Sequence, residues 1–358
     1  MGADEAEAYF YGISTANAFV KKEVYKKVIE TEDGYSKVYI SDQKRGGLYH
    51  LDTDIALQDN ARVVNFENGG RSYDFGFLKY NDEEEHGALA LQNGKQILID
   101  KAVLDDAVSF VEYMPKFTLM SSVGGKNADN IATLDKFFLY KGDHPVFGAE
   151  DLCFLRGDQY PDADVSICDY PVAAIKFVTL NRNTVIELLN DLTHGFERYV
   201  DEEAGVFGNI KNNANRTFFA LRILSDGRFC VNVFFTKVDD FDLYNKKKDL
   251  DRLFTTRYFP TALLGRFVID IEAERSVGFA KKYLLKKGKI NAEDNCPEFL
   301  KFLENAEEEF TLIEKKATAT INQAVVNKCD DFLRSVSAFN MREGLLPLKR
   351  FLASVHIR

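Results

Sequence analysis

Residues 217–238 read TFFALRILSDGRFCVNVFFTKV and carry the clearest structural signal in the chain. Aromatic and β-branched residues, which favour strands, lie on both sides of a Ser-Asp-Gly tripeptide. Gly227 accepts a positive φ, so this tripeptide suits a tight turn between antiparallel strands. The stretch therefore predicts a β-hairpin whose strands are Thr217–Leu224 and Arg228–Val238.

Helices are predicted on both sides of this hairpin. Before it, Thr184 and Glu187 have the spacing of a capping box, in which two side chains satisfy free backbone N–H groups at a helix start. The apolar residues that follow recur at helical intervals and form one stripe: Val185, Leu188, Leu189, Leu192 and Phe196. After the hairpin, the sequence predicts a strand at Arg266–Ile271 and then three amphipathic helical segments.

Short β-like runs dominate the first 180 residues, and Gly, Asp and Asn separate them. The runs are Ala8–Ile13, Lys37–Ile40, Arg62–Phe66, Tyr73–Tyr80, Gln96–Ile99, Lys116–Met120, Lys136–Tyr140 and Ala173–Leu180. Only Asn17–Glu30 and Lys101–Tyr113 have helical spacing there. We therefore predict an α+β fold, with a β-rich mixed N-terminal domain at residues 1–180 followed by an α+β domain at residues 181–358 that ends in packed helices.

Charge is divided unevenly between these two predicted domains. The chain of 358 residues has a formal net charge of -10. Residues 1–180 contain 18 basic and 30 acidic residues, whereas residues 241–358 contain 21 basic and 17 acidic residues. This distribution excludes a protein coated evenly in positive charge, but it allows the basic part to face a polyanion.

Cysteine usage and the N-terminal sequence predict a cytoplasmic protein. The five cysteines are scattered, odd in number and never spaced as in zinc sites or disulfide frameworks. The chain begins MGADEAEAYF, which lacks the basic and apolar regions of a signal peptide, and no apolar run is long enough to span a bilayer. We expect no membrane partner, and we expect no cofactor because no cofactor-binding motif is present.

The most specific candidate site is the basic segment RSVGFAKKYLLKKGKINA at residues 275–292. It contains six basic residues and no acidic residue: Arg275, Lys281, Lys282, Lys286, Lys287 and Lys289. On a helix, Val277, Ala280 and Leu284 fall on one face and lysines occupy another, so the segment can pack inward while offering charges to phosphates. The alternative interpretation is a solvated lysine-rich face that favours the negative end of the helix dipole.

Signals for catalysis are few. Ser122–Asn127 lacks the first glycine and the Ser or Thr of a phosphate-binding loop, so a turn is predicted there. Asp74-Phe75-Gly76 lies in an alternating apolar pattern that is typical of a strand. The five histidines share no ligand spacing and are interpreted as surface or locally bonded residues. These observations favour a protein without enzymatic activity.

Two charged groups leave a metal-dependent nuclease open as an alternative. Asp164, Asp169 and Lys176 surround a predicted strand, but Ala174 occupies the place of a second carboxylate. A second group shares one face if its strand continues: Asp270, Glu272 and Glu274. Such a face is more often the wet side of an antiparallel sheet.

Residues from about 215 to 350 resemble the 37-kDa nucleoid-associated protein family of bacteria. The resemblance rests on the strand pair, on Tyr258-Phe259-Pro260 and on four further segments. They are RFVIDIE at 266–272, SVGFAKKYLLKKG at 276–288, PEFLKFLENAEEEF at 297–310 and NKCDDFL at 327–333. The family resemblance implies a cytoplasmic DNA-associated protein without catalytic residues, whose basic residues at 275–289 contact backbone phosphates.

Three functional hypotheses follow. The leading one is a non-enzymatic, nucleoid-associated-like protein that binds nucleic acid without sequence specificity, with DNA as the expected partner. The alternative is a protein-interaction subunit of a larger bacterial or phage complex, acting in host–phage conflict such as phage defence, whose acidic N-terminal domain docks on a basic protein. Opposite charges in the two domains also permit a head-to-tail homo-oligomer. The third hypothesis is a divergent metal-dependent nuclease.

Overall fold

The computed structural model confirms the predicted α+β fold, with a large antiparallel sheet and a few helices. It describes residues 27–29, 37–42, 62–77, 86–91, 97–126, 132–141, 144–200, 215–237, 263–271, 330 and 333–358. Within these ranges, no helix combines the length and the apolar character that crossing a bilayer requires.

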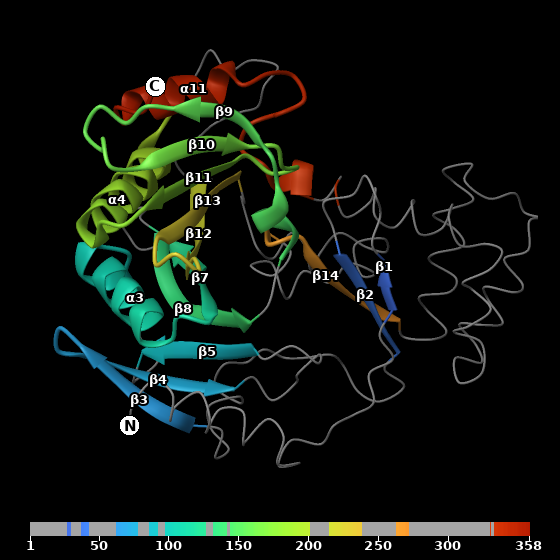
Figure 1. Cartoon of the computed structure of the whole chain (residues 1–358). Coiled ribbons are helices and arrows are strands. Elements are labelled where there is room, and N and C mark those ends of the chain that lie inside the picture. The colour runs from blue at the N-terminus through green and yellow to red at the C-terminus, as the bar shows by residue number, and fades with distance from the viewer. Residues whose placement is uncertain are drawn as a thin grey trace, which may run out of the picture.

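Most of the described strands belong to one antiparallel sheet of eleven strands (Figure 1). In spatial order they are β3 (Arg62–Asn68), β4 (Arg71–Phe77), β5 (His86–Leu91), β8 (Ala132–Lys141), β7 (Phe117–Lys126), β12 (Asn215–Ile223), β13 (Phe229–Lys237), β11 (Ala174–Thr179), β10 (Asp164–Cys168) and β9 (Asp151–Leu155). The short strand β6 (Ile97–Leu98) pairs with β8 outside this order. The sheet takes strands from both sides of residue 180, and the division into two domains at that residue stays a prediction.

The hairpin of β12 and β13 confirms the signal at residues 217–238. Gly227 has a φ of 84° and its N–H donates to the Leu224 carbonyl at 2.9 Å, which closes the turn. The two strands stay in register from Asn215 opposite Lys237 to Ile223 opposite Phe229. Because β12 also pairs with β7 and β13 with β11, the hairpin forms the middle of the sheet.

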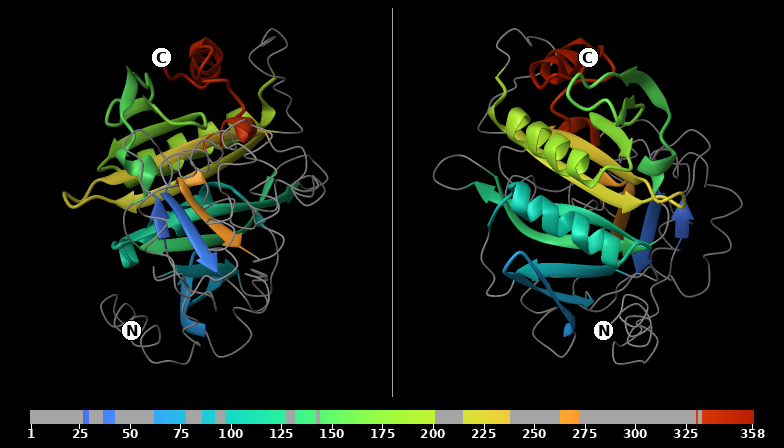
Figure 2. Two further views of the ribbon diagram at one scale, coloured as in Figure 1. Left: turned by 90° about the vertical axis from the view of Figure 1, so that its right-hand side faces the viewer. Right: turned by 60° about the vertical axis from the view of Figure 1, so that its left-hand side comes forward.

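Two helices cover one face of this sheet. α3 (Lys101–Tyr113) and α4 (Arg182–Arg198) lie side by side over it (Figure 2, right). α3 has the bounds that its apolar spacing predicts, and the Asp100 carboxylate caps it by accepting a hydrogen bond from the Val103 backbone N–H at 2.9 Å.

The start of α4 differs from the prediction. Asn181 is its N-cap, because the side-chain oxygen of Asn181 accepts hydrogen bonds from the backbone N–H groups of Asn183 and Thr184. The Thr184 hydroxyl donates instead to the Asp162 carboxylate, at 2.8 Å. The predicted capping role of Thr184 is therefore wrong, although the predicted helix is confirmed.

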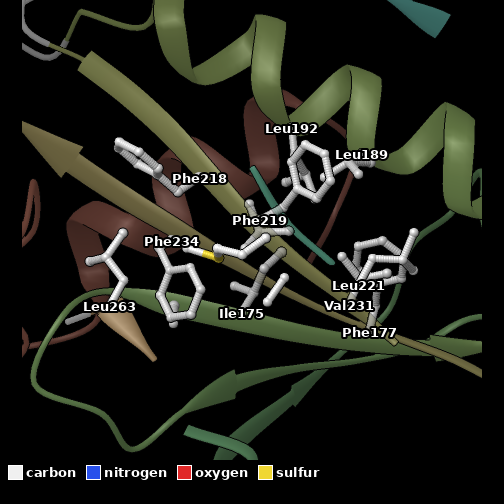
Figure 3. Close-up of a cluster of buried hydrophobic side chains, with 14 of the residues drawn as sticks. Ile175, Phe177, Leu189, Leu192, Phe218, Phe219, Leu221, Val231, Phe234 and Leu263 are labelled. Atoms are coloured by element: carbon white, nitrogen blue, oxygen red, sulfur yellow. The ribbon is translucent and has the colours of Figure 1, made fainter. Parts of the chain in front are cut away.

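The core lies between α4 and the centre of the sheet (Figure 3). Leu189 and Leu192 of α4 lie over Phe219, Leu221 and Val231, and all five side chains are buried. Burial of a side chain of this size contributes about 1.5–3 kcal/mol, so the predicted apolar stripe of α4 is what fixes this helix to the sheet.

A C-terminal helix, α11 (Leu346–Ser354), extends this core and was not predicted. The Phe351 ring packs edge-on against Phe196 of α4 and Phe235 of β13, with ring centroids 5.2 and 5.1 Å apart. A Cβ atom added at Gly195 would lie 2.5 Å from Val355 Cγ1, so glycine allows α4 and the end of α11 to approach closely.

A second, three-stranded sheet joins distant parts of the chain. It consists of β1 (Lys27–Ile29), β2 (Lys37–Asp42) and β14 (Arg266–Ile271). β14 confirms the predicted strand and pairs in parallel with β2. β1 contradicts the helix predicted for Asn17–Glu30 at the residues it covers, because pairing with Val38–Ile40 overrides the local helical spacing.

The remaining predictions about local structure have different outcomes. The predicted turn at Ser122–Asn127 is wrong up to Lys126, because β7 continues through that residue with irregular register next to Val123. Asp74-Phe75-Gly76 lies in β4, as predicted. The predicted strand at Ala8–Ile13 and most of the helical segments predicted after residue 271 lie outside the described residues.

Candidate functional site

The two faces of the main sheet carry different kinds of side chain. Residues alternate between the faces of a strand, so Ile175 and Phe177, which belong to the core, place Lys176 on the face opposite α3 and α4. In the same way, Val231 and Val233 place Asn232 on that opposite face. The opposite face therefore carries Lys176 and Asn232 beside buried apolar side chains such as Phe218 and Phe234.

Four residues form a line across neighbouring strands on this opposite face. Phe154 of β9 is paired with Ser166 of β10, Ser166 with Lys176 of β11, and Lys176 with Asn232 of β13. Directly paired residues of antiparallel strands share a face, so the four side chains emerge on the same side. We call Phe154, Ser166, Lys176 and Asn232 the transverse row.

Asp151 joins two members of the transverse row. Its carboxylate accepts a hydrogen bond from the Ser166 hydroxyl at 2.6 Å and forms an ion pair with Lys176 Nζ at 2.7 Å. The side chains of Lys176 and Asp151 are each 24% exposed, so the pair borders solvent. Burial would raise the pKa of Asp151, but the hydrogen bonds from Lys176 and Ser166 outweigh burial and lower the pKa below its usual value.

Asn232 has one end of its amide without a partner. The side chain is 0% exposed, and its Oδ1 atom has no hydrogen-bond partner in the described part of the protein. Its Nδ2 atom makes only a long contact of 3.8 Å with Cys168 Sγ. An unsatisfied buried polar group costs about 1–3 kcal/mol, and the Oδ1 atom of Asn215, on the helix-covered face, has no partner among the described residues either.

Arg222 adds a second cation beside the transverse row. It lies on the same face as Ala220, which is paired with Asn232, and is the next residue of β12 on that face. Its guanidinium carbon lies 3.7 Å from the centroid of the Phe147 ring. Lys176 and Arg222 can therefore place two positive charges on one face, which suits a phosphorylated ligand.

The nearby thiols are unsuited to nucleophilic chemistry. Burial raises the pKa of the Cys168 thiol to about 12 and also raises the pKa of Cys230. Both groups therefore stay protonated at neutral pH, and a protonated thiol is a poor nucleophile. His144 is buried as well, with its ring edge-on to Tyr140 and Phe147.

The structure separates the residues of the predicted nuclease site. Lys176 pairs with Asp151, an acid that the sequence reasoning missed. The side chain of Asp164 is 81% exposed and lies 3.8 Å from Arg228, and the Asp169 backbone N–H donates to the Glu150 carbonyl. Within the described ranges, no three His, Cys, Asp or Glu residues are placed to hold a metal ion.

The other predicted sites lie partly or wholly outside the described residues. Asp270 lies in β14, whereas Glu272 and Glu274 fall outside the described residues. The six basic residues that were expected to contact phosphates are also outside: Arg275, Lys281, Lys282, Lys286, Lys287 and Lys289. Their role stays a prediction.

A second polar cluster lies on the helix-covered face and has a different character. The buried Asp106 carboxylate of α3 accepts hydrogen bonds from Arg71, from the Tyr73 hydroxyl at 2.6 Å and from the Asn68 amide at 2.7 Å. Burial and the neighbouring carboxylate raise the pKa of Tyr73. Every partner named here belongs to the hairpin of β3 and β4, so this cluster ties that hairpin to α3.

Comparison with known proteins gives distant relatives, and no family model matches the chain. A galactose-1-phosphate uridylyltransferase of Fusobacterium nucleatum is 21% identical over 166 residues, which cover 45% of this chain and 32% of the relative. The enzyme of the same name from Lactococcus lactis subsp. cremoris strain SK11 is 19% identical over 325 residues, covering 87% of this chain and 64% of the relative. The chain spans less than two thirds of the length of these relatives.

Among solved structures, yeast Ap4A phosphorylase in complex with Ap4A is 14% identical and has a TM-score of 0.39. The match covers 80% of this chain and 94% of the yeast chain. A protein of the DUF4931 family from Bacillus cereus is 9% identical, with a TM-score of 0.33, over 51% of this chain and 89% of its own.

These relatives overturn the functional predictions. The resemblance to the nucleoid-associated family is wrong, and so are the non-enzymatic DNA-binding function, the nucleic-acid partner and the role in phage defence, because the relatives are uridylyltransferases. The error has a physical origin. A strand pair followed by amphipathic helices and lysine-rich turns is a pattern that many unrelated α+β proteins share.

Proposed function

We propose that this chain binds a uridine nucleotide and a sugar phosphate and takes part in uridylyl transfer between phosphate groups. The observation that carries the proposal is the match to uridylyltransferases, which in the Lactococcus lactis enzyme extends over 87% of this chain. The transverse row and Arg222 supply the kind of site that such substrates need, with two cations beside hydrogen-bonding groups on one sheet face.

The reaction moves a uridylyl group from one phosphate oxygen to another. An oxygen of the acceptor sugar phosphate ends bonded to the α-phosphorus, while the bond from that phosphorus to the bridging oxygen breaks and the donor leaves as its own sugar phosphate. Charge spread over phosphate oxygens is stabilised chiefly by fixed cations and by positioning. In this proposal Lys176 and Arg222 provide the cations, and Asp151 holds Lys176 in place.

The experiment mixes the full chain with galactose 1-phosphate and UDP-glucose and follows the phosphorus NMR spectrum for glucose 1-phosphate and UDP-galactose. Equilibrium dialysis with labelled UMP measures nucleotide binding separately. Lys176→Met should weaken UMP binding by about 10- to 150-fold, since a hydrogen bond to a charged group contributes about 1.5–3 kcal/mol.

Lys101→Met is the matched control, because Lys101 lies on the helix-covered side and pairs with Glu187 there. It should leave UMP binding unchanged. Binding without exchange would contradict the transfer step and support the binding step. The absence of both in the wild-type chain would overturn the proposal.

The cytoplasm is the compartment that fits this proposal. Cys153, Cys168 and Cys230 are free thiols, as expected in a reducing environment. Labelling of the protein in intact cells with a thiol reagent that does not cross membranes should leave Cys153, the partly exposed one of the three, unmodified, whereas the same reagent should modify it after lysis.

A further inference from the structure

The turn between β3 and β4 contains an asparagine followed directly by a glycine. It reads Asn68-Gly69-Gly70-Arg71, and Asn68 is paired with Arg71 across it. Gly69 and Gly70 have positive φ values of 54° and 79°, as a two-residue hairpin turn of this kind requires. Both glycines are exposed, so solvent reaches the tip of the hairpin.

An asparagine before a glycine is prone to lose its side-chain amide, because no Cβ atom shields the glycine nitrogen. In this reaction the Gly69 backbone nitrogen attacks the Asn68 side-chain carbonyl carbon and forms a bond to it, which closes a cyclic imide. The bond from that carbon to Nδ2 breaks, and Nδ2 takes the proton that the Gly69 nitrogen loses and leaves as ammonia. Water then opens the imide and leaves a carboxylate, on aspartate or on isoaspartate.

The Asn68 amide is held against acceptors on α3. Its Nδ2 atom donates to Asp106 Oδ1 at 2.7 Å, and to Asp105 Oδ2 and the Ser109 hydroxyl oxygen at 3.3 Å each. An ionised carboxylate only accepts hydrogen bonds, so this position requires a donor. The nitrogen that deamidation removes is therefore an atom that attaches the tip of the hairpin to α3.

The surroundings of this amide already contain more negative than positive charge. Among the described residues, three carboxylates of α3 face two guanidinium groups: Asp106 binds Arg71, and Asp105 and Glu112 bind Arg182. A carboxylate in place of the amide adds a like charge beside Asp105 and Asp106, and like charges this close repel each other. Asp106 is 0% exposed, so salt screens this repulsion weakly.

We propose that Asn68 is a site of spontaneous deamidation, and that its conversion to a carboxylate releases the hairpin of β3 and β4 from α3. β3 is the last strand at its end of the main sheet, so the hairpin can open locally while the rest of the sheet stays paired. The hydrogen bonds to α3 hold the amide in place while the hairpin is docked, so the open hairpin is the form that reacts. Each conversion then opposes redocking, which makes the change one-way.

Peptide mapping by mass spectrometry measures the reaction itself. The full chain is incubated at mildly alkaline pH, both folded and unfolded in guanidinium chloride, and the mass increase from replacement of NH2 by OH is followed. Asn68 should convert in both samples, but more slowly in the folded chain. Asn183 is the matched control, because it is exposed but precedes a threonine, and it should stay intact over the same period.

Hydrogen exchange measures the release of the hairpin. Asn68→Asp places the charge of the product at the site and should speed exchange of the β4 backbone amides by about 10- to 150-fold, the range expected for the loss of a hydrogen bond to a charged group. Asn68→Ser removes the amide without adding a charge and should have a smaller effect. Asn183→Asp adds the same charge at an exposed position of α4 and should leave exchange in β4 unchanged.

The two measurements can each overturn the proposal. If Asn68 stays intact in the folded chain while it converts in the unfolded chain, Asn68 is not a modification site of the native protein. If Asn68→Asp exchanges in β4 at the wild-type rate, or no faster than Asn68→Ser, the added carboxylate does not release the hairpin. Conversion in the folded chain, together with faster exchange confined to β3 and β4 in Asn68→Asp, supports the proposal.

Discussion

Asp106 and Asn232 are buried to the same extent, at 0% exposed, but their surroundings differ completely. Asp106 belongs to α3 and receives hydrogen bonds from three side chains of the β3–β4 hairpin, including Arg71 and Tyr73. Asn232 faces the other side of the sheet, and its Oδ1 atom has no partner among the described residues.

The difference indicates what each buried group contributes. A buried charge with a full set of partners holds elements together, and its loss leaves those partners uncompensated. A buried amide with an unpaired acceptor stabilises little by itself. Both faces carry buried core side chains, among them Phe218 and Phe234 opposite the helices, and the candidate site lies on that opposite face.

Replacement of Asp106 by alanine should have the largest effect. The change leaves Arg71 and Tyr73 without their buried partner, so the free energy of unfolding should fall by about 3–5 kcal/mol. Urea denaturation followed by circular dichroism measures this loss. Glu67→Gln is the control, because Glu67 accepts only an exposed hydrogen bond from Ser72 and its change should cost less than about 0.5 kcal/mol. Equal losses in the two variants would contradict the role of Asp106.

Replacement of Lys176 by methionine should have an intermediate effect on stability. The ion pair with Asp151 borders solvent, so its loss should cost about 1 kcal/mol at neutral pH. The pKa of Asp151 is lower in the folded chain than in the unfolded chain, so its stabilising contribution is present above the unfolded pKa of about 3.9 and is lost as the pH falls through the folded pKa.

Carbon NMR of the Asp151 carboxyl tests this sign. Its pKa should move upward in Lys176→Met, and the stability difference between the wild type and this variant should shrink below about pH 4. An unchanged pKa of Asp151 would show that Lys176 does not control this carboxyl group.

Replacement of Asn232 by leucine should have the smallest effect on stability, even though the residue is buried. Leucine of similar size removes an amide that has only a long contact with Cys168, so the free energy of unfolding should change by less than about 1 kcal/mol. Asn215→Leu is the matched control. Asn215 is equally buried, but its amide donates to the carbonyls of Phe196 and Tyr199, so its replacement should cost at least about 2 kcal/mol. A loss at Asn232 as large as that at Asn215 would contradict this difference between the two amides.

Much of the local structure could be predicted from the sequence. The bounds of α3 and β14 and the turn at Gly227 follow from short-range spacing and from the conformational freedom of glycine. β1 could not be predicted in this way, because its strand state depends on pairing with β2, and the parallel pairing of β2 with β14 joins segments far apart in sequence.

The candidate site was only partly visible in the sequence for a related reason. Sequence spacing groups Lys176 with Asp164 and Asp169, which are closer to it along the chain than Asp151 is. Asp151 is the partner of Lys176 because the strand order brings β9 close to β11. The register between β9 and β10, which is irregular between Ile167 and Cys168, then places the Asp151 carboxylate next to Lys176. Such registers depend on tertiary packing, which local spacing does not encode.

Two segments that pair in the folded protein are synthesised at different times, because they lie far apart in the chain. The backbone groups of Arg156 and Arg358 bond to each other, Gly157 pairs with Ile357, and the Ile357 side chain is buried. At a synthesis rate of about 5–20 residues per second, the segment that follows β9 waits roughly 10 to 40 s for its partner. During that interval the edge of the sheet next to Phe154 has no partner strand, and an unpaired edge is a site where chains can associate wrongly.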